Sequence, residues 1–167
     1  MNKVVRCDGK EFEYEGCLGC EIVKGNLPSF GEVVYEDEEF FVVQDFELPI
    51  NGFIVISTKR CISSINEMTE NERVNLIKLI NKLLIKLKEL NICSHFNIVQ
   101  QEKEGYHFHV WLMPALNWMK EKFGKTLKNL KPIFDYALAN FRDKEHLDEI
   151  SNITKMLKEE MKKQSKI

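Results

Sequence analysis

The sequence predicts an α+β fold in which a sheet of about five strands carries one long helix and is extended by helices at its carboxy terminus. Five short segments, of which four form two neighbouring pairs, are rich in residues that favour β-strands. One long stretch repeats its apolar residues at helical spacing, and so does the last part of the chain. A length of 167 residues suits a single core.

The amino-terminal part predicts a β-hairpin over residues 1–16, because Asp8-Gly9 between apolar residues is typical of a tight turn. Cys17-Leu18-Gly19-Cys20 follows. The next residues predict one helical turn at most, since Gly25 and Pro28 end it.

The strands of the sheet are expected in two places. Val33–Tyr35 and Phe40–Val43 form a predicted hairpin around an acidic turn, and Phe53–Ile56 is a predicted central strand. Phe96–Gln101 and Tyr106–Met113 are expected to form two more strands, joined by a short polar turn.

The long helix is predicted over Val74–Leu90, behind a capping box of Thr69 and Glu72. Its apolar residues occupy two neighbouring stripes, which is more than contact with one sheet requires. A second subunit is one candidate to cover the excess.

The chain after Pro114 changes to a helical pattern. We expect a domain over residues 1–116 and a helical extension over residues 117–167, with Pro132 in a first helical turn. Apolar residues at helical spacing predict that the extension packs on the domain or on a partner: Leu147, Ile150, Ile153, Leu157 and Met161.

Composition narrows the class of protein. The net charge of −2 provides no basic field for nucleic acid, and neither an apolar leader nor a run long enough to span a membrane is seen. We therefore expect a cytoplasmic protein that binds neither nucleic acid nor membranes. Five cysteines are an odd number, and without an export signal they argue against a disulfide framework, which leaves metal binding or burial to account for them.

The strand Tyr106–Met113 carries the clearest chemistry. Alternation places His107, His109 and Trp111 on one face and apolar residues on the other. A neutral imidazole can attack phosphorus near pH 7, so the histidine pair suits phosphoryl or nucleotidyl transfer. Taken alone, the pair is more typical of structural or surface histidines.

The chain from Cys17 to Pro114 resembles the histidine triad superfamily, segment by segment and in the order of that family. The matching segments are Cys17–Pro28, Val34–Asp37 with Val43–Asp45, Gly52–Arg60 and His107–Pro114. The resemblance implies an antiparallel sheet with the long helix on one face, a homodimer, and a substrate that is a nucleotide or a dinucleoside polyphosphate.

The resemblance also implies roles for single residues. His109 would be the nucleophile, and the main-chain carbonyl of His107 would orient its ring. Asp45 would bind the ribose hydroxyls beside Phe46 in the nucleotide site. Without the family, Asp45 reads equally well as a turn residue at the end of a strand.

Three features depart from the family. Trp111 and Phe53 stand where the family has histidines that help the leaving group depart. The turn before the signature strand is short, so donors to the phosphate are expected from Gln100, Gln101, Lys103 or the Gly105 amide. Trp111 can still donate one hydrogen bond or stack on a base.

The Cys-x-x-C motif at Cys17 and Cys20 supplies two thiolates for a Zn²⁺ ion. The family implies that Cys61 and His107 complete the set as a structural zinc site. Buried, unpaired thiols are the alternative, and a redox role would require a longer following helix.

Three functions remain open from sequence. The chain is an enzyme that cleaves or transfers a nucleoside monophosphate through His109, a nucleotide-binding module without turnover, or an interaction protein that uses the helical extension.

Overall fold

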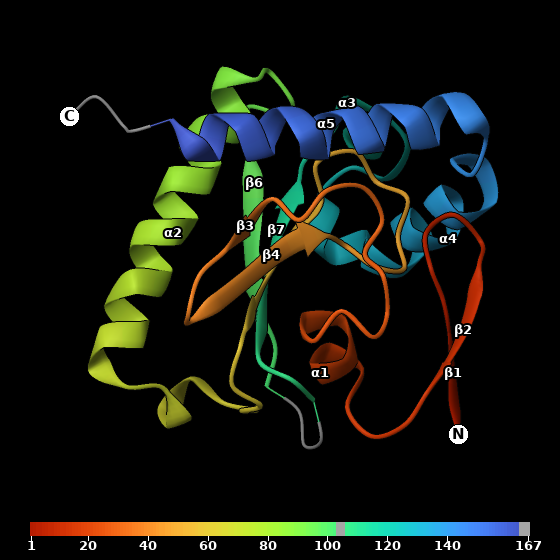
Figure 1. Cartoon of the computed structure of the whole chain (residues 1–167). Helices are drawn as coiled ribbons and strands as arrows, with labels where there is room; N and C mark the ends of the chain where they lie inside the picture. Colours follow the sequence, from red (N-terminus) through yellow and green to blue (C-terminus); the bar gives the residue numbers. More distant parts are fainter. Residues whose placement is uncertain (103–105, 164–167) are drawn as a thin grey trace.

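The computed structural model describes residues 1–102 and 106–163 and confirms the α+β prediction (Figure 1). The main sheet has five strands in the order β3-β4-β5-β7-β6, and every neighbouring pair is antiparallel. Its strands are β3 (Tyr35–Glu36), β4 (Phe40–Gln44), β5 (Ile54–Thr58), β6 (Phe96–Gln100) and β7 (His109–Pro114).

The amino-terminal hairpin is a separate two-stranded ribbon of β1 (Asn2–Val5) and β2 (Glu11–Tyr14). The main-chain amide of Cys7 donates to the carbonyl of Phe46 at 2.7 Å, which ties the ribbon to the chain that leaves β4. Helix α1 (Leu18–Val23) follows, and Gly25 ends it with a positive φ of 76°.

Helix α2 (Glu70–Glu89) begins at the predicted capping box. The Thr69 hydroxyl accepts from the Glu72 amide at 3.1 Å, and the Glu72 carboxylate accepts from the Thr69 amide at 2.7 Å. The helix buries Leu76, Leu83 and Leu87 against one face of the sheet, in the core that also holds Val110 and Leu112. Val74 and Ile77, on the opposite side of the helix, stay exposed.

The extension consists of α3 (Asn117–Phe123), a short 3-10 turn (Thr126–Asn129), α4 (Leu130–Asn140) and α5 (Lys144–Lys162). Figure 1 shows α5 crossing above β3 and β4 to the carboxy-terminal end of α2, where Lys82 donates to the carbonyl of Met161 at 2.9 Å. Leu157 and Met161 belong to the core beneath α2. The helices of the extension are confirmed, and α5 packs on the same core as the sheet.

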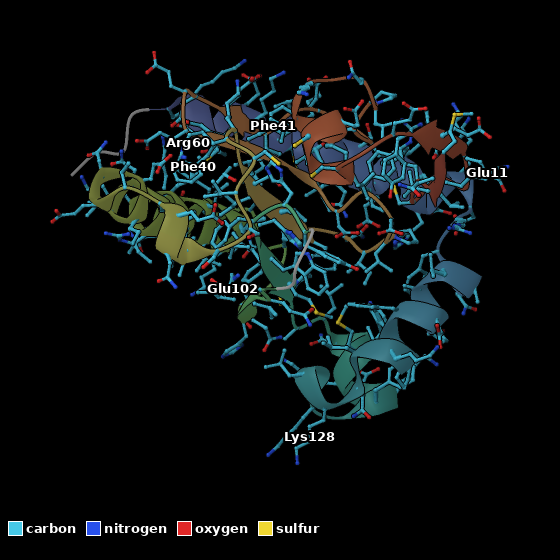
Figure 2. All side chains as sticks on the ribbon, turned by 90° about the horizontal axis from the view of Figure 1, so that it is seen from below. Glu11, Phe40, Phe41, Arg60, Glu102 and Lys128 are labelled. Carbon is cyan, nitrogen blue, oxygen red and sulfur yellow. The ribbon has the colours of Figure 1, made fainter. Side chains whose placement is uncertain are left out.

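Helices α3 and α4 form a second apolar cluster around Phe53, Met113, Met119 and Ile133. Figure 2 shows this part projecting away from the sheet, with Lys128 at its outer end. The cluster reaches the other face of the sheet, the face that carries His109 and Trp111.

The starts of two strands differ from the prediction by at least two residues. Strand β7 begins at His109 instead of Tyr106, because the His107 side chain is held by groups outside the strand. Strand β3 begins at Tyr35 instead of Val33, although the Val34 amide still donates to the carbonyl of Val42 at 2.9 Å. In the described part of the chain, no helix has the length and apolarity needed to cross a bilayer.

Burial of α5 predicts a stability difference between two leucines of the extension. Leu157 is 0% exposed and Leu127 is 54% exposed. Leu157→Ala should lower the free energy of unfolding by about 2–5 kcal/mol, since it removes methyl groups from a packed core. Leu127→Ala is the matched control, and equal denaturant midpoints for the two variants would contradict the packing of α5.

Candidate metal centre and nucleotide site

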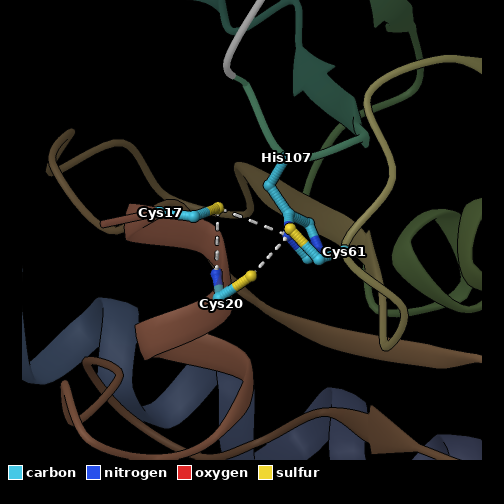
Figure 3. A group of neighbouring side chains, drawn as sticks. All are labelled: Cys17, Cys20, Cys61 and His107. Atoms are coloured by element: carbon cyan, nitrogen blue, oxygen red, sulfur yellow. Dashed lines mark hydrogen bonds between the residues drawn. The ribbon is translucent and has the colours of Figure 1, made fainter. Parts of the chain in front are cut away.

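Four side chains from three separate segments meet beside the sheet. Cys17 and Cys20 lie at the start of α1, Cys61 follows β5, and His107 lies two residues before the start of β7 (Figure 3). Their ligand atoms all lie within 4.8 Å of one another. His107 Nδ1 is 3.6 Å from the sulfur of Cys17 and 3.4 Å from that of Cys20.

The motif between the two cysteines lets His107 come close. The Cys17 sulfur caps α1 by accepting from the Cys20 amide at 3.5 Å, which fixes the turn. A Cβ atom on Gly19 would lie 2.4 Å from the Cβ of His107. Only glycine at this position allows the backbone of α1 to approach the histidine.

The two nitrogens of His107 have different partners. Nε2 lies 2.6 Å from the carbonyl oxygen of Thr58, which can only accept, so Nε2 carries the proton. Nδ1 therefore presents its lone pair to the cysteine sulfurs. Burial lowers the pKa of His107 and favours the neutral ring. A histidine that ligates a metal typically shows this arrangement, with its second nitrogen hydrogen-bonded to a carbonyl.

The loop that carries Cys61 is anchored on α2. Both oxygens of Glu72 accept from the neighbouring Arg60 guanidinium at 2.8 Å, and this pairing holds the pKa of Glu72 down at about 2. Burial, followed by hydrogen bonding with Cys61 and Cys17, raises the pKa of the Cys20 thiol to about 12. Such a thiol ionises readily only with a cation beside it.

A cavity of about 460 Å³ lies next to this cluster, and His109 and Trp111 line it. His109 Nδ1 is 2.8 Å from the main-chain oxygen of His107. Because that oxygen only accepts, Nδ1 carries the proton and the lone pair of the ring is at Nε2. His107 and His109 are thus linked through the main chain of one and the side chain of the other.

Asp45 lines the cavity and also stabilises a turn. Its Oδ1 accepts from the amides of Glu47 and Leu48 at 3.0 and 2.9 Å. Burial raises the pKa of Asp45 to about 7. Phe46, the next residue, packs with Val4 and Leu27 and forms an apolar wall of the same cavity.

The two positions that depart from the family are in contact. The rings of Phe53 and Trp111 meet edge to face with centroids 5.5 Å apart. Phe134 of α4 lies 6.2 Å from Phe53 and 6.0 Å from Trp111, and Trp111 lies 5.8 Å from His109. The extension therefore supports the ring of Trp111 beside His109.

The residues expected to hold phosphate are arranged differently. Gln100 and Gln101 are exposed at the end of β6 and are not among the residues that line the cavity. Lys103 and Gly105 lie outside the described residues. The cavity is lined instead by residues that the sequence analysis did not select, among them Lys3, Tyr14 and Ser57. Alternation along β5 predicts only which residues of that strand share a face with Ser57. It does not predict which residue of the next strand lies beside Ser57, because that depends on the register between the strands.

Comparison with known proteins supports the resemblance seen in the sequence. No family model matches the chain. An uncharacterised HIT-like protein of Methanocaldococcus jannaschii is 32% identical over 101 residues, which are 56% of this chain and 76% of that protein. The chain belongs to the histidine triad family.

Solved structures agree with the histidine triad fold. A zinc-bound histidine triad family protein of Mycobacterium smegmatis is 17% identical, with a TM-score of 0.61 over 87% of this chain and 92% of that one. A hypothetical histidine triad nucleotide-binding protein of Sulfolobus tokodaii is 18% identical, with a TM-score of 0.60 over 87% and 91%. At these sequence identities, the similarities show that the fold is shared.

The raised pKa of Asp45 predicts a pH-dependent stability. Between its ordinary value of 3.8 and about 7, the folded state keeps a proton that the unfolded state has released. Stability contributed by this group is therefore lost as pH rises through that window. Asp45→Asn removes the titration and keeps an oxygen for the turn amides. Its stability relative to the parent should rise by on the order of 1–3 kcal/mol from about pH 5 to about pH 8.

Denaturant unfolding at several pH values measures this difference. Asp148→Asn, at an exposed position of α5, is the control and should keep a constant offset from the parent. An offset for Asp45→Asn that does not change with pH would show that Asp45 is ionised in the folded state throughout.

Proposed function

We propose that this histidine triad protein is a nucleotide hydrolase or nucleotidyl transferase that acts on the α-phosphate of a nucleotide or a dinucleoside polyphosphate. The observation that carries the proposal is the hydrogen bond between His109 Nδ1 and the carbonyl of His107, because it leaves a lone pair on Nε2 of a ring that lines the cavity. Membership of the histidine triad family supports the same role for His109.

The chemistry proceeds in two steps. His109 Nε2 forms a bond to the α-phosphorus while the bond to the leaving oxygen breaks, and its electron pair stays on the leaving group. The His107 carbonyl stabilises the positive charge that develops on the ring through the Nδ1 proton. Water or another acceptor then attacks the same phosphorus, releases the nucleotide and restores His109.

The remaining wall of the cavity is proposed to hold the nucleoside. The free oxygen of Asp45 suits the ribose hydroxyls, while Phe46 and its apolar neighbours suit the base. Trp111 offers a ring for stacking next to His109. These placements agree with a nucleotide whose phosphate faces His109.

We also propose that Cys17, Cys20, Cys61 and His107 hold a structural Zn²⁺ ion. A tetrahedral ion with Zn–S of ~2.3 Å and Zn–N of ~2.1 Å separates sulfur and nitrogen by about 3.6 Å. The observed separations of 3.6 and 3.4 Å match this value. The donor set and the protonated Nε2 of His107 therefore fit zinc, which would hold α1, the Cys61 loop and the start of β7 together.

A homodimer is proposed through the exposed side of α2 and the free edge of the sheet. Ile77 on α2 is 65% exposed and Ile98 on the edge strand β6 is 55% exposed. Both surfaces would be covered by a second copy of the chain, and the open hydrogen-bonding edge of β6 would be paired.

A nucleotide-binding module without turnover is the second candidate. The observation that favours it is the contact of Trp111 with Phe53 and Phe134, which leaves an apolar wall where family members have histidines. Such a wall binds a nucleotide without providing a proton for the leaving group.

The nucleophile is tested by trapping the adduct. The parent, incubated with a panel of nucleoside triphosphates and dinucleoside tetraphosphates, should gain the mass of one nucleotide on His109. His109→Ala should lose both the adduct and at least about 10³-fold of the activity, because it lacks the attacking atom. His95→Ala, at an exposed histidine, is the control. Equal activity of His109→Ala and the parent would refute the mechanism, and nucleotide binding without any adduct would favour the binding module.

Metal analysis tests the zinc site. The parent is expected to contain about one zinc ion per chain, and Cys61→Ser should lose zinc and unfold at a lower temperature, because a structural zinc contributes directly to folding. Cys93→Ser is the matched control, since Cys93 lies away from the cluster. A parent free of zinc, or a Cys61→Ser protein with a full complement of it, would eliminate the site.

A further inference from the structure

Ser57 stands directly opposite His109 in the sheet. The two residues are register partners in the antiparallel pair of β5 and β7. Side chains of such partners lie on the same face, with Cβ atoms about 4.5–5.5 Å apart. Ser57 also lines the cavity that His109 lines.

The hydroxyl of Ser57 differs from that of its neighbour Thr58. Thr58 donates its hydroxyl hydrogen to the carbonyl of Arg60 at 2.9 Å and is not among the residues that line the cavity. Ser57 is only 9% exposed, and within the described residues its hydroxyl has no hydrogen-bond partner. Its oxygen is not among the fully buried, unpaired polar atoms of the described residues, so it is open to the cavity and available to a ligand there.

The surroundings of Ser57 make a serine costly for folding alone. Val55 lies on the same face of β5 as Ser57 and is buried, whereas Ile54 and Ile56 point to the other face, into the core under α2. Phe41, the register partner of Ser57 on the other side, is also buried. An apolar side chain would pack better among these residues. The presence of a serine therefore indicates that its hydroxyl binds a ligand in the cavity.

Among the described residues, Lys3, Tyr14 and Tyr106 also line the cavity, but none of them is a strand partner of His109. On its own strand the next residue of the same face is Trp111, which is packed against Phe53 and Phe134. Gln100 and Gln101 do not line the cavity. Ser57 is the hydroxyl that the register places next to the attacking ring.

We propose that the Ser57 hydroxyl donates a hydrogen bond to a non-bridging oxygen of the phosphate that His109 attacks. The inference rests on the proposed function. As the bond from His109 Nε2 to phosphorus forms and the bond to the leaving oxygen breaks, negative charge gathers on the non-bridging oxygens, and the donated bond strengthens. Serine keeps its proton throughout, so it binds the transition state and takes no part in proton transfer.

Three variants separate this role from packing. Ser57→Ala removes the donor, Ser57→Cys keeps nearly the same shape with a weaker donor, and Ser57→Thr keeps the hydroxyl. The rate of adduct formation on His109 is measured in single turnovers, with the nucleotide that labels the parent fastest. Nucleoside monophosphate binding, zinc content and thermal unfolding are measured on the same proteins.

The expected result is a loss of about 10²-fold in the adduct rate for Ser57→Ala and a smaller loss in the same direction for Ser57→Cys. Ser57→Thr should stay within about tenfold of the parent, and monophosphate binding should change little. Ser94→Ala, at an exposed serine, should match the parent. If Ser57→Ala does not fold, Ser57→Cys decides, because it preserves the packing.

Two outcomes overturn the inference while the proposed function stands. One is an adduct rate in Ser57→Ala and Ser57→Cys equal to that of the parent. The other is an equal loss of monophosphate binding and of adduct rate, which would make Ser57 a ground-state contact only. A parent that never forms an adduct would overturn the proposed function itself, and the role of Ser57 with it.

Discussion

His107 is the residue on which the site depends, because its imidazole and its main-chain carbonyl together join three parts of the chain. Nδ1 faces the cysteine sulfurs of α1, and Nε2 donates to Thr58 at the end of β5. The carbonyl of the same residue accepts from His109. Each contact limits the rotation of the ring or of its backbone, so a change in one displaces the others. The proposed metal site and the proposed nucleophile are therefore a single structural unit.

Local patterns predicted most of the fold. The capping box of Thr69 and Glu72 and the alternation of Phe108, Val110 and Leu112 depend on neighbours in sequence, and both were found. The start of β7 was predicted too early, since the contacts that hold His107 come from cysteines 90 and 87 residues away. The spacing of apolar residues along the sequence gives no information about contacts between residues so far apart.

The site was only partly accessible from sequence for the same reason. His109, Trp111, Asp45 and Phe46 line one cavity. Alternation along the last strand indicates the first two, and the resemblance to the family indicates Asp45 and Phe46. Ser57 was not selected, because its relation to His109 depends on the register between β5 and β7. Phe134 was equally hidden, since helical spacing predicts that α4 is buried but does not identify the rings it meets.

Phe53 and Trp111, which stand where the family has histidines, contact each other and Phe134. These two departures from the family therefore form one coordinated change. The three rings pack against one another, and the third of them comes from α4.

An apolar wall of this kind provides no titratable group to protonate a leaving oxygen. A leaving group that departs as a stable anion needs no such proton. The phosphate chain of a nucleotide or a dinucleoside polyphosphate meets this requirement, whereas an amine or an alkoxide does not. The chemistry proposed for His109 is thus compatible with a tryptophan at the third position when a phosphate is the group that leaves.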